Sequence, residues 1–407
     1  MPLENPKKHI ALVTTWFPPL KSVAVNRMLA FTKYLDKTKY KVTVITLNGG
    51  TALPKEEIHG ATIFRLSNNQ KIRLPKFNND PRMVHYLKVI WKLVLLKFYK
   101  NEFSQWTKDV EKKMTHIHQQ EPIDCVISSF SPVAPHLASY DFCEKHKAVK
   151  WIVDMRDEMS RNPQIDVATK RYFESVEKKI AKRATALISV SIPIVNYFKE
   201  ATPNIKKYLE IRNGYDNEII PKRQFVNDCF TILYAGNFYG KRKPHTFFEA
   251  LVSVVNDGEM PEKWMINFVG TPKNFNVPKA IENNITFTTQ RTQEECVDLM
   301  NNADVNLLIQ PFVGRKGVFT GKVFDYLSVQ KPILAVVDEQ DVAAQLINTL
   351  KLGYVADFEN INQIERQIRL AVDDWKNKRP IQSNIADIKK MHRKFQVKKL
   401  EQLIDSI

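Results

Sequence analysis

The chain has 407 residues, of which 43% are hydrophobic and 26% charged, and its formal net charge is +17. A single hydrophobic core rarely extends beyond about 250–300 residues, so we expect a chain of this length to form two domains. The sequence contains no run of about 18 apolar residues, so we expect no helix to span a bilayer. The short apolar stretch near the N-terminus is typical of a first strand and not of a secretory signal.

The cysteines and the charge distribution indicate a compartment and a kind of partner. Cys125, Cys143, Cys229 and Cys296 lie far apart and form no CxxC pair, which predicts reduced thiols in a cytosolic protein, with neither a disulfide framework nor a zinc site. Residues 1–100 hold 18 Lys/Arg against 5 Asp/Glu, whereas residues 201–407 hold 28 against 25. A positive excess at one end favours an anionic partner there, either nucleic acid or an anionic membrane surface.

Short apolar segments alternate with helical patterns along the chain. We expect strands at residues 10–15, 41–47, 62–66, 124–128, 150–154 and 186–191, and then at 231–235, 265–269, 285–288, 304–309 and 333–337. Near-continuous apolar strands separated by helices predict parallel α/β sheets covered on both faces, as two doubly wound domains. An Asn-Gly turn at 213–214 and a Pro-Lys-Arg sequence at 221–223 set the domains at 1–215 and 228–389. Ligands of such sheets bind beyond the carboxyl ends of the strands, and the default site is a cleft between the two domains.

Residues 84–100 read VHYLKVIWKLVLLKFYK and stand apart from the sheet pattern. On a helix, one face gathers Val84, Leu87, Ile90, Trp91, Val94, Leu95 and Phe98, and the other gathers His85, Lys88, Lys92 and Lys100 with Val89, Leu93 and Leu96 intruding. A basic, aromatic-bearing amphipathic helix favours a membrane surface, which Lys88, Trp91, Lys92 and Lys100 would contact. The alternative is a core helix whose lysines extend to water. Nucleic acid is not favoured, because helix-turn-helix, RNP-like and zinc patterns are absent from the sequence.

Residues 320–327 read TGKVFDYL and lead into the apolar run at 332–337. A helix that begins near Gly321 would present free backbone N–H groups and the positive end of its dipole, which attract phosphate. Lys322 adds a charge for a phosphate oxygen, and Asp325, one turn on, can accept hydrogen bonds from sugar hydroxyls. The segment therefore favours a nucleoside diphosphate. The alternative is a capped surface helix before a strand.

Three polar groups in the first half of the chain are further candidates. The loop after the first strand, with Pro18, Pro19 and then Arg27, lacks a GxGxxG pattern and either lines the cleft or is a rigid turn. His136 follows the segment SSFSP and either assists sugar binding and proton transfer or is structural. Asp154, Arg156 and Asp157 end a strand and form either an internal ion pair or part of an acceptor site.

The first loop of the second half reads YAGNFYG and is followed by three cations. Gly236 and Asn237 would let the backbone approach a ligand, and Lys241, Arg242 and Lys243 would suit pyrophosphate. The alternative is a solvated basic loop. Patterns of metalloproteases, P-loop NTPases and α/β-hydrolases (HExxH, Walker A, GxSxG) are missing, which disfavours these classes.

Eight segments, taken in order, resemble family 4 glycosyltransferases of the GT-B fold. They are ALVTTWFPP, SSFSPVAPH, WIVDMRDE, ALISVS, IRNGYD, ILYAGNFYG, NNADVNLLI and TGKVFDYLSVQKPIL, and they span nearly the whole chain. The nearest likeness is to bacterial enzymes of capsule, O-antigen or exopolysaccharide synthesis.

The resemblance implies a fold and a distribution of roles. Two Rossmann-like domains would face a cleft, the first binding the acceptor and the second the nucleotide sugar, and a final helix within residues 390–407 would cross back to the first. Lys322 would meet the donor pyrophosphate, Asp325 the ribose, and Arg291 the base. Gly236, Asn237 and a nearby cation would lie near the phosphates, and His136 would face the transferred sugar.

The sequence departs from the family pattern near the donor motif and in the first loop. Many members carry two glutamates eight residues apart, where this chain has Gly317 and Asp325. The ribose contact would thus come from a shorter carboxylate, and the sugar contact of the first glutamate would be missing unless Lys316 or backbone groups replace it. Leu20-Lys21-Ser22-Val23 stands where members have a glycine-rich loop.

The leading hypothesis is therefore a retaining glycosyltransferase that needs no metal or other cofactor. It would move a hexosyl or N-acetylhexosaminyl unit from a UDP-linked donor to a lipid-linked glycan, as a cytoplasmic protein peripheral at the inner face of the cell membrane. One alternative is a GT-B nucleotide-sugar epimerase, which acts on free nucleotide sugars. Another is a non-catalytic, membrane-docked subunit of a polysaccharide assembly complex, in which Gly317 and Asp325 mark lost activity.

Overall fold

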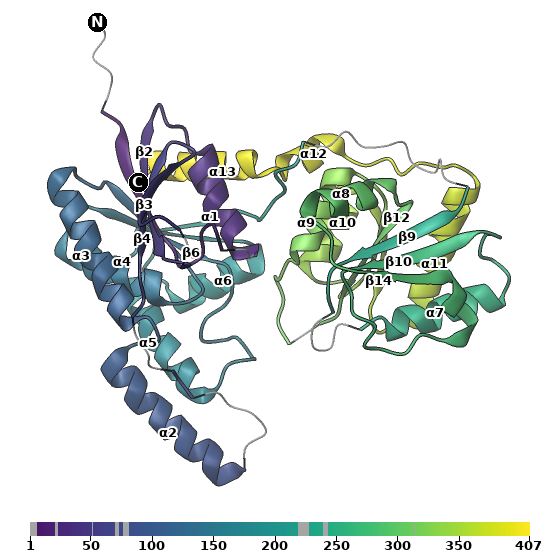
Figure 1. Ribbon diagram of the computed structural model, residues 1–407, viewed down its shortest axis with the longest axis horizontal. Helices are drawn as coiled ribbons and strands as arrows, with labels where there is room; N and C mark the ends of the chain where they lie inside the picture. The colour runs from purple at the N-terminus through teal and green to yellow at the C-terminus, as the bar shows by residue number, and fades with distance from the viewer. Residues whose placement is uncertain are drawn as a thin grey trace, which may run out of the picture. The chain divides into compact units, whose positions relative to one another are not determined.

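The computed structural model describes residues 6–20, 23–50, 52–69, 73–75, 81–218, 228–238, 243–312 and 314–407. The chain divides into two compact units, the first comprising Met1–Arg212 and Lys394–Ile407 and the second Asn213–Arg393. Each unit is built on its own sheet (Figure 1).

The first unit holds an eight-stranded sheet in its described residues, in the order β3-β4-β2-β1-β5-β6-β7-β8. The strands are β1 (Lys8–Val13), β2 (Tyr40–Leu47), β3 (Lys55–Ile58), β4 (Ala61–Leu66), β5 (Cys125–Ser129), β6 (Lys150–Met155), β7 (Ala186–Ser189) and β8 (Lys207–Glu210). Apart from the antiparallel β3–β4 edge pair, these neighbours pair in parallel. From β4 to β7 the order is that of a Rossmann sheet, whose winding reverses between β1 and β5.

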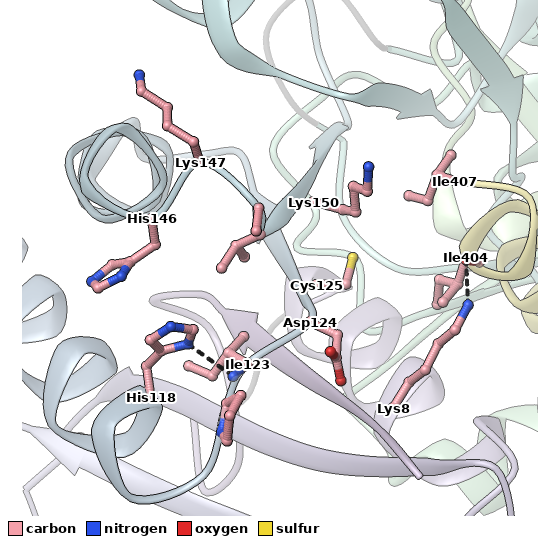
Figure 2. Close-up of a pocket in the computed structure, with 13 residues that line it drawn as sticks. Lys8, His118, Ile123, Asp124, Cys125, His146, Lys147, Lys150, Ile404 and Ile407 are labelled. Atoms are coloured by element: carbon pink, nitrogen blue, oxygen red, sulfur yellow. Dashed lines mark hydrogen bonds between the residues drawn. The ribbon is translucent and has the colours of Figure 1, made fainter. Parts of the chain in front are cut away.

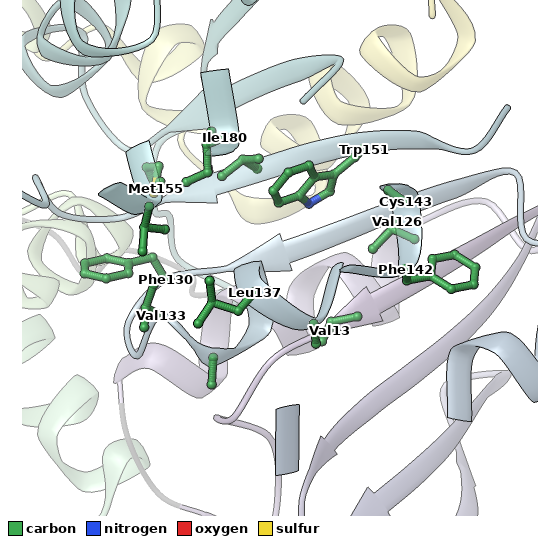
Figure 3. Close-up of a cluster of buried hydrophobic side chains, with 14 of the residues drawn as sticks. Val13, Val126, Phe130, Val133, Leu137, Phe142, Cys143, Trp151, Met155 and Ile180 are labelled. Atoms are coloured by element: carbon green, nitrogen blue, oxygen red, sulfur yellow. The ribbon is translucent and has the colours of Figure 1, made fainter. Parts of the chain in front are cut away.

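Helices cover both faces of this sheet, because successive residues of each buried strand point to opposite faces. The helices are α1 (Val23–Tyr34), α2 (Arg82–Tyr99), α3 (Ser104–Gln120), α4 (Ala134–Lys145), α5 (Val167–Arg183), α6 (Ile192–Ala201) and α13 (Arg393–Asp405). On one face Val126 and Trp151 pack with α3 to α6 residues such as Met114, Phe142 and Ile180, part of which Figure 3 shows. The other face packs against α1 and α13.

In the part that the structure describes, the second unit repeats this architecture with six parallel strands, in the order β11-β10-β9-β12-β13-β14. They are β9 (Phe230–Ala235), β10 (Trp264–Val269), β11 (Ile285–Thr288), β12 (Val305–Gln310), β13 (Ile333–Val337) and β14 (Gly353–Asp357). Helices α7 (His245–Asn256) and α11 (Ile361–Lys376) cover one face. The other face is covered by α8 (Gln293–Asn302), α9 (Gly321–Val329), α10 (Val342–Leu350) and α12 (Ile385–Lys390), and a short 3-10 helix, η1 (Lys279–Asn284), precedes β11.

The predicted fold class, two doubly wound parallel α/β sheets, is confirmed. All eleven expected strands form, and both ends of each lie within two residues of the expected bounds. Strands β3, β8 and β14 were not predicted, and each lies at the edge of its sheet. Edge strands bury less surface, so β3 (KEEI) and β8 (KYLE) lack the apolar run that marks a central strand.

Candidate functional site

The second unit brings its sequence motifs to the point where the sheet reverses its winding. Strands β9 and β12 are neighbours there, and their carboxyl ends lie at the same edge. Gly236 and Asn237 follow β9 directly, and the loop after β12 leads to α9, which begins at Gly321 as expected. Open α/β sheets bind ligands at this point. The two segments that the sequence singled out are thus the two that form the expected ligand edge.

Lys322, in the first turn of α9, reaches back over the end of β9. Its Nζ donates a hydrogen bond to the Tyr234 hydroxyl at 2.6 Å and lies 3.4 Å from the Asn237 carbonyl oxygen. The same ammonium lies 4.1 Å from the centre of the Tyr234 ring. Tyr234 is itself buried and stacks on Phe238, with ring centres 4.3 Å apart. These contacts hold a positive charge at the carboxyl edge of the sheet.

Gly236 is required by this position of Lys322. Its φ of +107° lies in a region that side-chain-bearing residues rarely adopt, and a Cβ added there would lie 2.7 Å from the Lys322 Cε. The Gly236 N–H donates to the Val269 carbonyl at 2.7 Å, and its own carbonyl accepts from the Thr271 hydroxyl. Glycine therefore lets the backbone and the lysine share this space.

The N-terminus of α9 lacks a side-chain cap. Thr320 occupies the N-cap position, but its hydroxyl caps no backbone N–H and is buried with no hydrogen-bond partner among the residues that the structure describes. Tyr326 fixes the helix from behind, since its hydroxyl accepts from the Ala235 N–H at 3.3 Å and donates to the Leu307 carbonyl at 3.0 Å. An anchored helix with an uncapped N-terminus is suited to an anionic ligand.

Asp325 lies one turn further along α9 and is partly buried. Its carboxylate makes no hydrogen bond or ion pair with the described part of the chain. Burial raises the pKa of Asp325 to about 6, although the nearby Arg393 lowers it. Partial burial of a carboxylate is costly, and a hydrogen bond from a ligand hydroxyl would offset part of that cost.

The loop between β12 and α9 is held by a buried carboxylate from another strand end. The Gly317 N–H donates to Asp341 Oδ1 at 2.6 Å, and the same oxygen accepts from the Val342 N–H that starts α10. Gly317 has a φ of +89°, so glycine suits the position conformationally. Lys316, a proposed substitute for the missing glutamate, donates instead to Gln340 Oε1 at 3.0 Å.

The other predicted donor residues are more dispersed. Arg291 lies just before α8 and pairs with Glu295 at 3.4 Å. Lys243 is exposed just before α7. Lys241 and Arg242 lie outside the described residues. The described structure thus brings Gly236, Asn237, Gly321 and Lys322 together.

In the first unit, Arg27 and Asp154 form a buried ion pair. The Arg27 Nη2 donates to Asp154 Oδ1 at 2.8 Å, and the two side chains are 4% and 0% exposed. Arg27 Nη1 also donates to the Ile211 carbonyl at 2.7 Å, and the Ser129 hydroxyl donates to Asp154 Oδ2 at 2.9 Å. This network ties α1 to the carboxyl ends of β5, β6 and β8, so the pair has a structural task whether or not it also serves an acceptor. The partner of Asp154 is Arg27 and not the adjacent Arg156.

Arg156 instead joins the loops at the carboxyl edge of the first sheet. It donates to the carbonyls of Phe130 and Ser131, and the Trp16 indole N–H reaches the same Ser131 carbonyl at 2.8 Å. Asp157 follows it, partly exposed. Of the two loop prolines, Pro19 is exposed and the Pro18 carbonyl accepts from Arg65 at 2.7 Å. An acceptor role for these residues stays a prediction.

His136 lies inside the first unit, in the first turn of α4, and is fully buried. Its Nδ1 is 2.7 Å from the Ser128 hydroxyl, which also accepts from the Trp151 indole N–H at 2.8 Å. Burial lowers the pKa of His136 to about 3, so the ring is neutral near pH 7. The imidazole is enclosed by protein, and its predicted contact with the transferred sugar stays a prediction that this geometry does not support.

A pocket of about 440 Å³ lies at the opposite, amino edge of the first sheet (Figure 2). Its lining includes residues at the starts of β1, β5 and β6, namely Lys8, Cys125 and Lys150. Its cations are partly engaged, since Lys8 donates to the Ile404 carbonyl at 3.2 Å and Lys147 to Glu144 at 2.7 Å. The amino edge is not where parallel sheets bind their ligands, so we do not place the site there.

Most of the predicted apolar face of helix α2 is exposed, whereas Lys92 of its basic face is buried. Leu87, Trp91 and Phe98 are 59%, 57% and 74% exposed, whereas Lys92 is buried and donates to Asp166 at 2.7 Å. Of the other lysines of the predicted membrane surface, Lys88 is partly buried, and Lys100 is exposed and lies 3.8 Å from Asp141. Lys92 therefore anchors α2 to the first turn of α5 and does not face a membrane. No helix in the described ranges has the length and hydropathy of a membrane span.

The fold is similar to solved structures along almost its whole length. A sucrose-phosphate synthase from Thermosynechococcus elongatus matches with a TM-score of 0.64 and 14% sequence identity, over 98% of this chain and 99% of that one. HepE from Anabaena in complex with UDP matches with a TM-score of 0.65 and 13% identity, over 98% and 100%. The lipopolysaccharide outer core galactosyltransferase WaaB, in its apo form, matches with a TM-score of 0.58 and 12% identity, over 98% and 99%.

These likenesses define the fold as GT-B, with two Rossmann-like units. No protein-family model matches the sequence, and no curated protein sequence matches it. Within the described ranges, no group of three or more His, Cys, Asp or Glu side chains could hold a metal ion.

Sequence reasoning missed several residues that shape the site. Tyr234, Thr320 and Asp341 were not candidates, although the first orients Lys322 and the last holds the loop before α9. The one available signal was a tyrosine near the end of the otherwise aliphatic segment FTILYA. The role of Asp341 depends on a contact across 24 residues, which no local pattern reveals.

We predict that Asp154→Ala lowers the free energy of unfolding by about 3–5 kcal/mol, because it leaves the Arg27 charge buried without its partner. The double variant Arg27→Met/Asp154→Ala should lose less than the sum of Arg27→Met and Asp154→Ala. Urea unfolding of all four proteins measures this coupling. The exposed pair of Arg161 and Glu200, treated in the same way, is the control and should couple by at most about 1 kcal/mol. Equal coupling in the two pairs would contradict the structural role.

We predict that Asp325→Asn stabilises the protein at pH 7.5 by about 1–3 kcal/mol, at about 1.4 kcal/mol for each unit of pKa shift. The unfolded carboxyl group releases its proton near pH 3.8 and the folded one near 6, so the wild type loses stability as the pH rises through this interval. The gain from Asp325→Asn should therefore be smaller at pH 5. Thermal unfolding at both pH values measures it, with the exposed Asp298→Asn as control. A gain independent of pH would contradict the burial of a charged Asp325.

Proposed function

We propose that the protein is a glycosyltransferase that takes a sugar from a nucleoside diphosphate sugar. The observation that carries this proposal is the position of Lys322, which projects its ammonium over Gly236 beside the uncapped N-terminus of α9. A diphosphate bound there would meet a cation and free backbone N–H groups together. The likeness to HepE, a structure solved with UDP, supports a UDP-linked donor.

In the proposed reaction, the bond between the sugar C1 and the diphosphate oxygen breaks, and negative charge grows on the departing diphosphate. Lys322 and the α9 N-terminus would stabilise this charge, and such stabilisation is usually the largest single contribution to catalysis. The acceptor hydroxyl would bond to the same carbon and pass its proton to the departing phosphate, so that no enzymic nucleophile is needed. Retention of configuration at C1 and independence from metal are part of the proposal and rest on the family resemblance.

For the remaining donor contacts we propose that Asp325 accepts hydrogen bonds from the ribose hydroxyls and that Arg291 flanks the base. The partial burial of Asp325 without a partner supports this. The transferred unit would be a hexose or an N-acetylhexosamine. Lys243, with Lys241 and Arg242, would add cations near the phosphates.

We further propose that the acceptor is a lipid-linked glycan of capsule, O-antigen or exopolysaccharide synthesis, met at the inner face of the cell membrane. Helix α2 supports this, because its outward face presents six apolar side chains at helical spacing: Met83, Leu87, Ile90, Trp91, Val94 and Phe98. The helix carries four basic residues and no acidic one. An exposed apolar stripe on a basic helix fits the boundary of an anionic bilayer. The acceptor would be bound by the first unit.

We predict that Lys322→Ala lowers turnover of the UDP-sugar about 10²–10³-fold, since it removes a charge that opposes the leaving diphosphate. Release of UDP, measured with a panel of UDP-sugars and a membrane extract as acceptor, gives the rate. Lys279→Ala, which removes an exposed lysine of the same unit, is the control and should keep the wild-type rate. Normal turnover by Lys322→Ala would refute the donor site. A changed sugar without any added acceptor would favour an epimerase.

We predict that the double variant Trp91→Ser/Phe98→Ser lowers binding to anionic liposomes at least tenfold, because about 25 cal/mol per Å² of apolar burial is lost. Sedimentation with phosphatidylglycerol vesicles measures the bound fraction. Leu53→Ser, at an exposed leucine away from α2, is the matched control and should bind as the wild type does. Undiminished binding of the double variant would show that α2 is not the membrane-facing element.

A further inference from the structure

A second pocket lies in the first unit behind α2. It has a volume of about 180 Å³ and an apolar lining made by Leu74, Leu96, Phe103, Val133, Tyr172 and Phe173. These residues come from the segment before α2, the inner face of α2, the start of α3, the loop before α4, and α5. The volume is below the about 300 Å³ of a complete small-molecule site, so the pocket suits a segment of a larger ligand.

One wall of the pocket belongs to the ligand edge of the first sheet. Ser131, Pro132 and Val133 line the pocket and follow the carboxyl end of β5, next to the reversal of winding between β1 and β5. The Ser131 carbonyl accepts from Trp16 and Arg156, which follow β1 and β6. The pocket therefore opens beside the loops where a ligand of this sheet would bind.

The opposite wall is the packed side of α2. Lys92 and Leu96 line the pocket, and Trp91 and Phe98 stand on the exposed side of the same helix. Lys92 holds this wall in place through Asp166, which also accepts from the Thr169 hydroxyl at 2.7 Å. One helix thus separates an exposed apolar surface from an apolar pocket that reaches the sheet edge.

The polar groups of the pocket do not select an anion. Lys92 is paired with Asp166, and the exposed Glu102 brings a negative charge to the rim. The recognisable feature is the hydrocarbon lining, which favours an apolar chain over a free phosphate or sugar. Helix α2 contains no acidic residue of its own, and its cations other than Lys92 are complementary to an anionic bilayer, which indicates the source of that chain.

We propose that this pocket binds the hydrocarbon chain of the membrane lipid that carries the acceptor, at the part of the chain next to its phosphate. The inference rests on the proposed function for the identity of the lipid. The chain would pass from the bilayer beside α2 into the pocket, so that the phosphate and the glycan emerge at the loop after β5. The pocket would hold the acceptor in one orientation before a donor arrives.

The test measures binding of farnesyl phosphate, a water-soluble probe with a branched hydrocarbon chain, by titration calorimetry with the full chain. Leu74→Glu places a charge in the lining, and Leu74→Trp fills it; each should lower affinity at least fivefold. Leu74 lies in a loop and is half-buried, so the fold should persist, as an unchanged melting temperature would verify. Leu53→Glu is the matched control and should bind with wild-type affinity.

Three results would overturn the assignment: no binding of farnesyl phosphate by the wild type, equal affinity in the Leu74 variants, or displacement of the probe by inorganic phosphate alone. Failure of the pocket assignment and failure of the proposed function can be told apart. Retained probe binding without any UDP-sugar turnover would refute the transferase and leave the lipid pocket standing. Turnover with a soluble acceptor, without probe binding, would refute the pocket alone.

Discussion

The parallel pairing of β9 with both β10 and β12 is the constraint on which the candidate donor site depends. Because the carboxyl ends of all three strands point the same way, the segments that follow them must meet at one edge. The start of α9 then necessarily presents its N–H groups and its positive dipole end at that edge. Lys322 has its place because Gly236 leaves room for it and Tyr234 lies beneath it. Without the parallel order, these residues would be unrelated in space.

Two polar groups, at the N-cap and on the second turn of α9, lose contact with water in the folded chain. The Thr320 hydroxyl is buried without a partner among the described residues, and Asp325 is a carboxylate whose pKa burial raises. Each costs stability, because a buried polar group loses its bonds to water. A bound ligand that forms hydrogen bonds with these groups would recover the lost free energy in the complex. Their concentration on one helix is consistent with α9 as the centre of binding.

The sequence predicted the sheets well and the site in part. Central strands such as β9 and β13 are covered on both faces, so their residues are nearly all apolar and easily recognised. The edge strands were missed because edge positions do not demand that composition.

Lys322 and Gly236 were identified because a glycine before a helix start and a glycine after a strand have local physical meanings. Asp341 could not be found locally, since its role is a contact with Gly317 across the sheet edge. Helical periodicity predicted that α2 is amphipathic, but it did not reveal that Lys92 is buried and bonded to Asp166.

The first unit is discontinuous in the chain. Val397, Leu400 and Ile404 of α13 pack with Ile10 and Leu12 of β1, although the whole second unit lies between them in sequence. A ribosome therefore releases one face of the first sheet long before the residues that cover it. During synthesis that face must stay exposed, or be covered by something else, until the second unit has been completed. The second unit, continuous from residue 213 to 393, has no such dependence and can close as soon as its own last helix emerges.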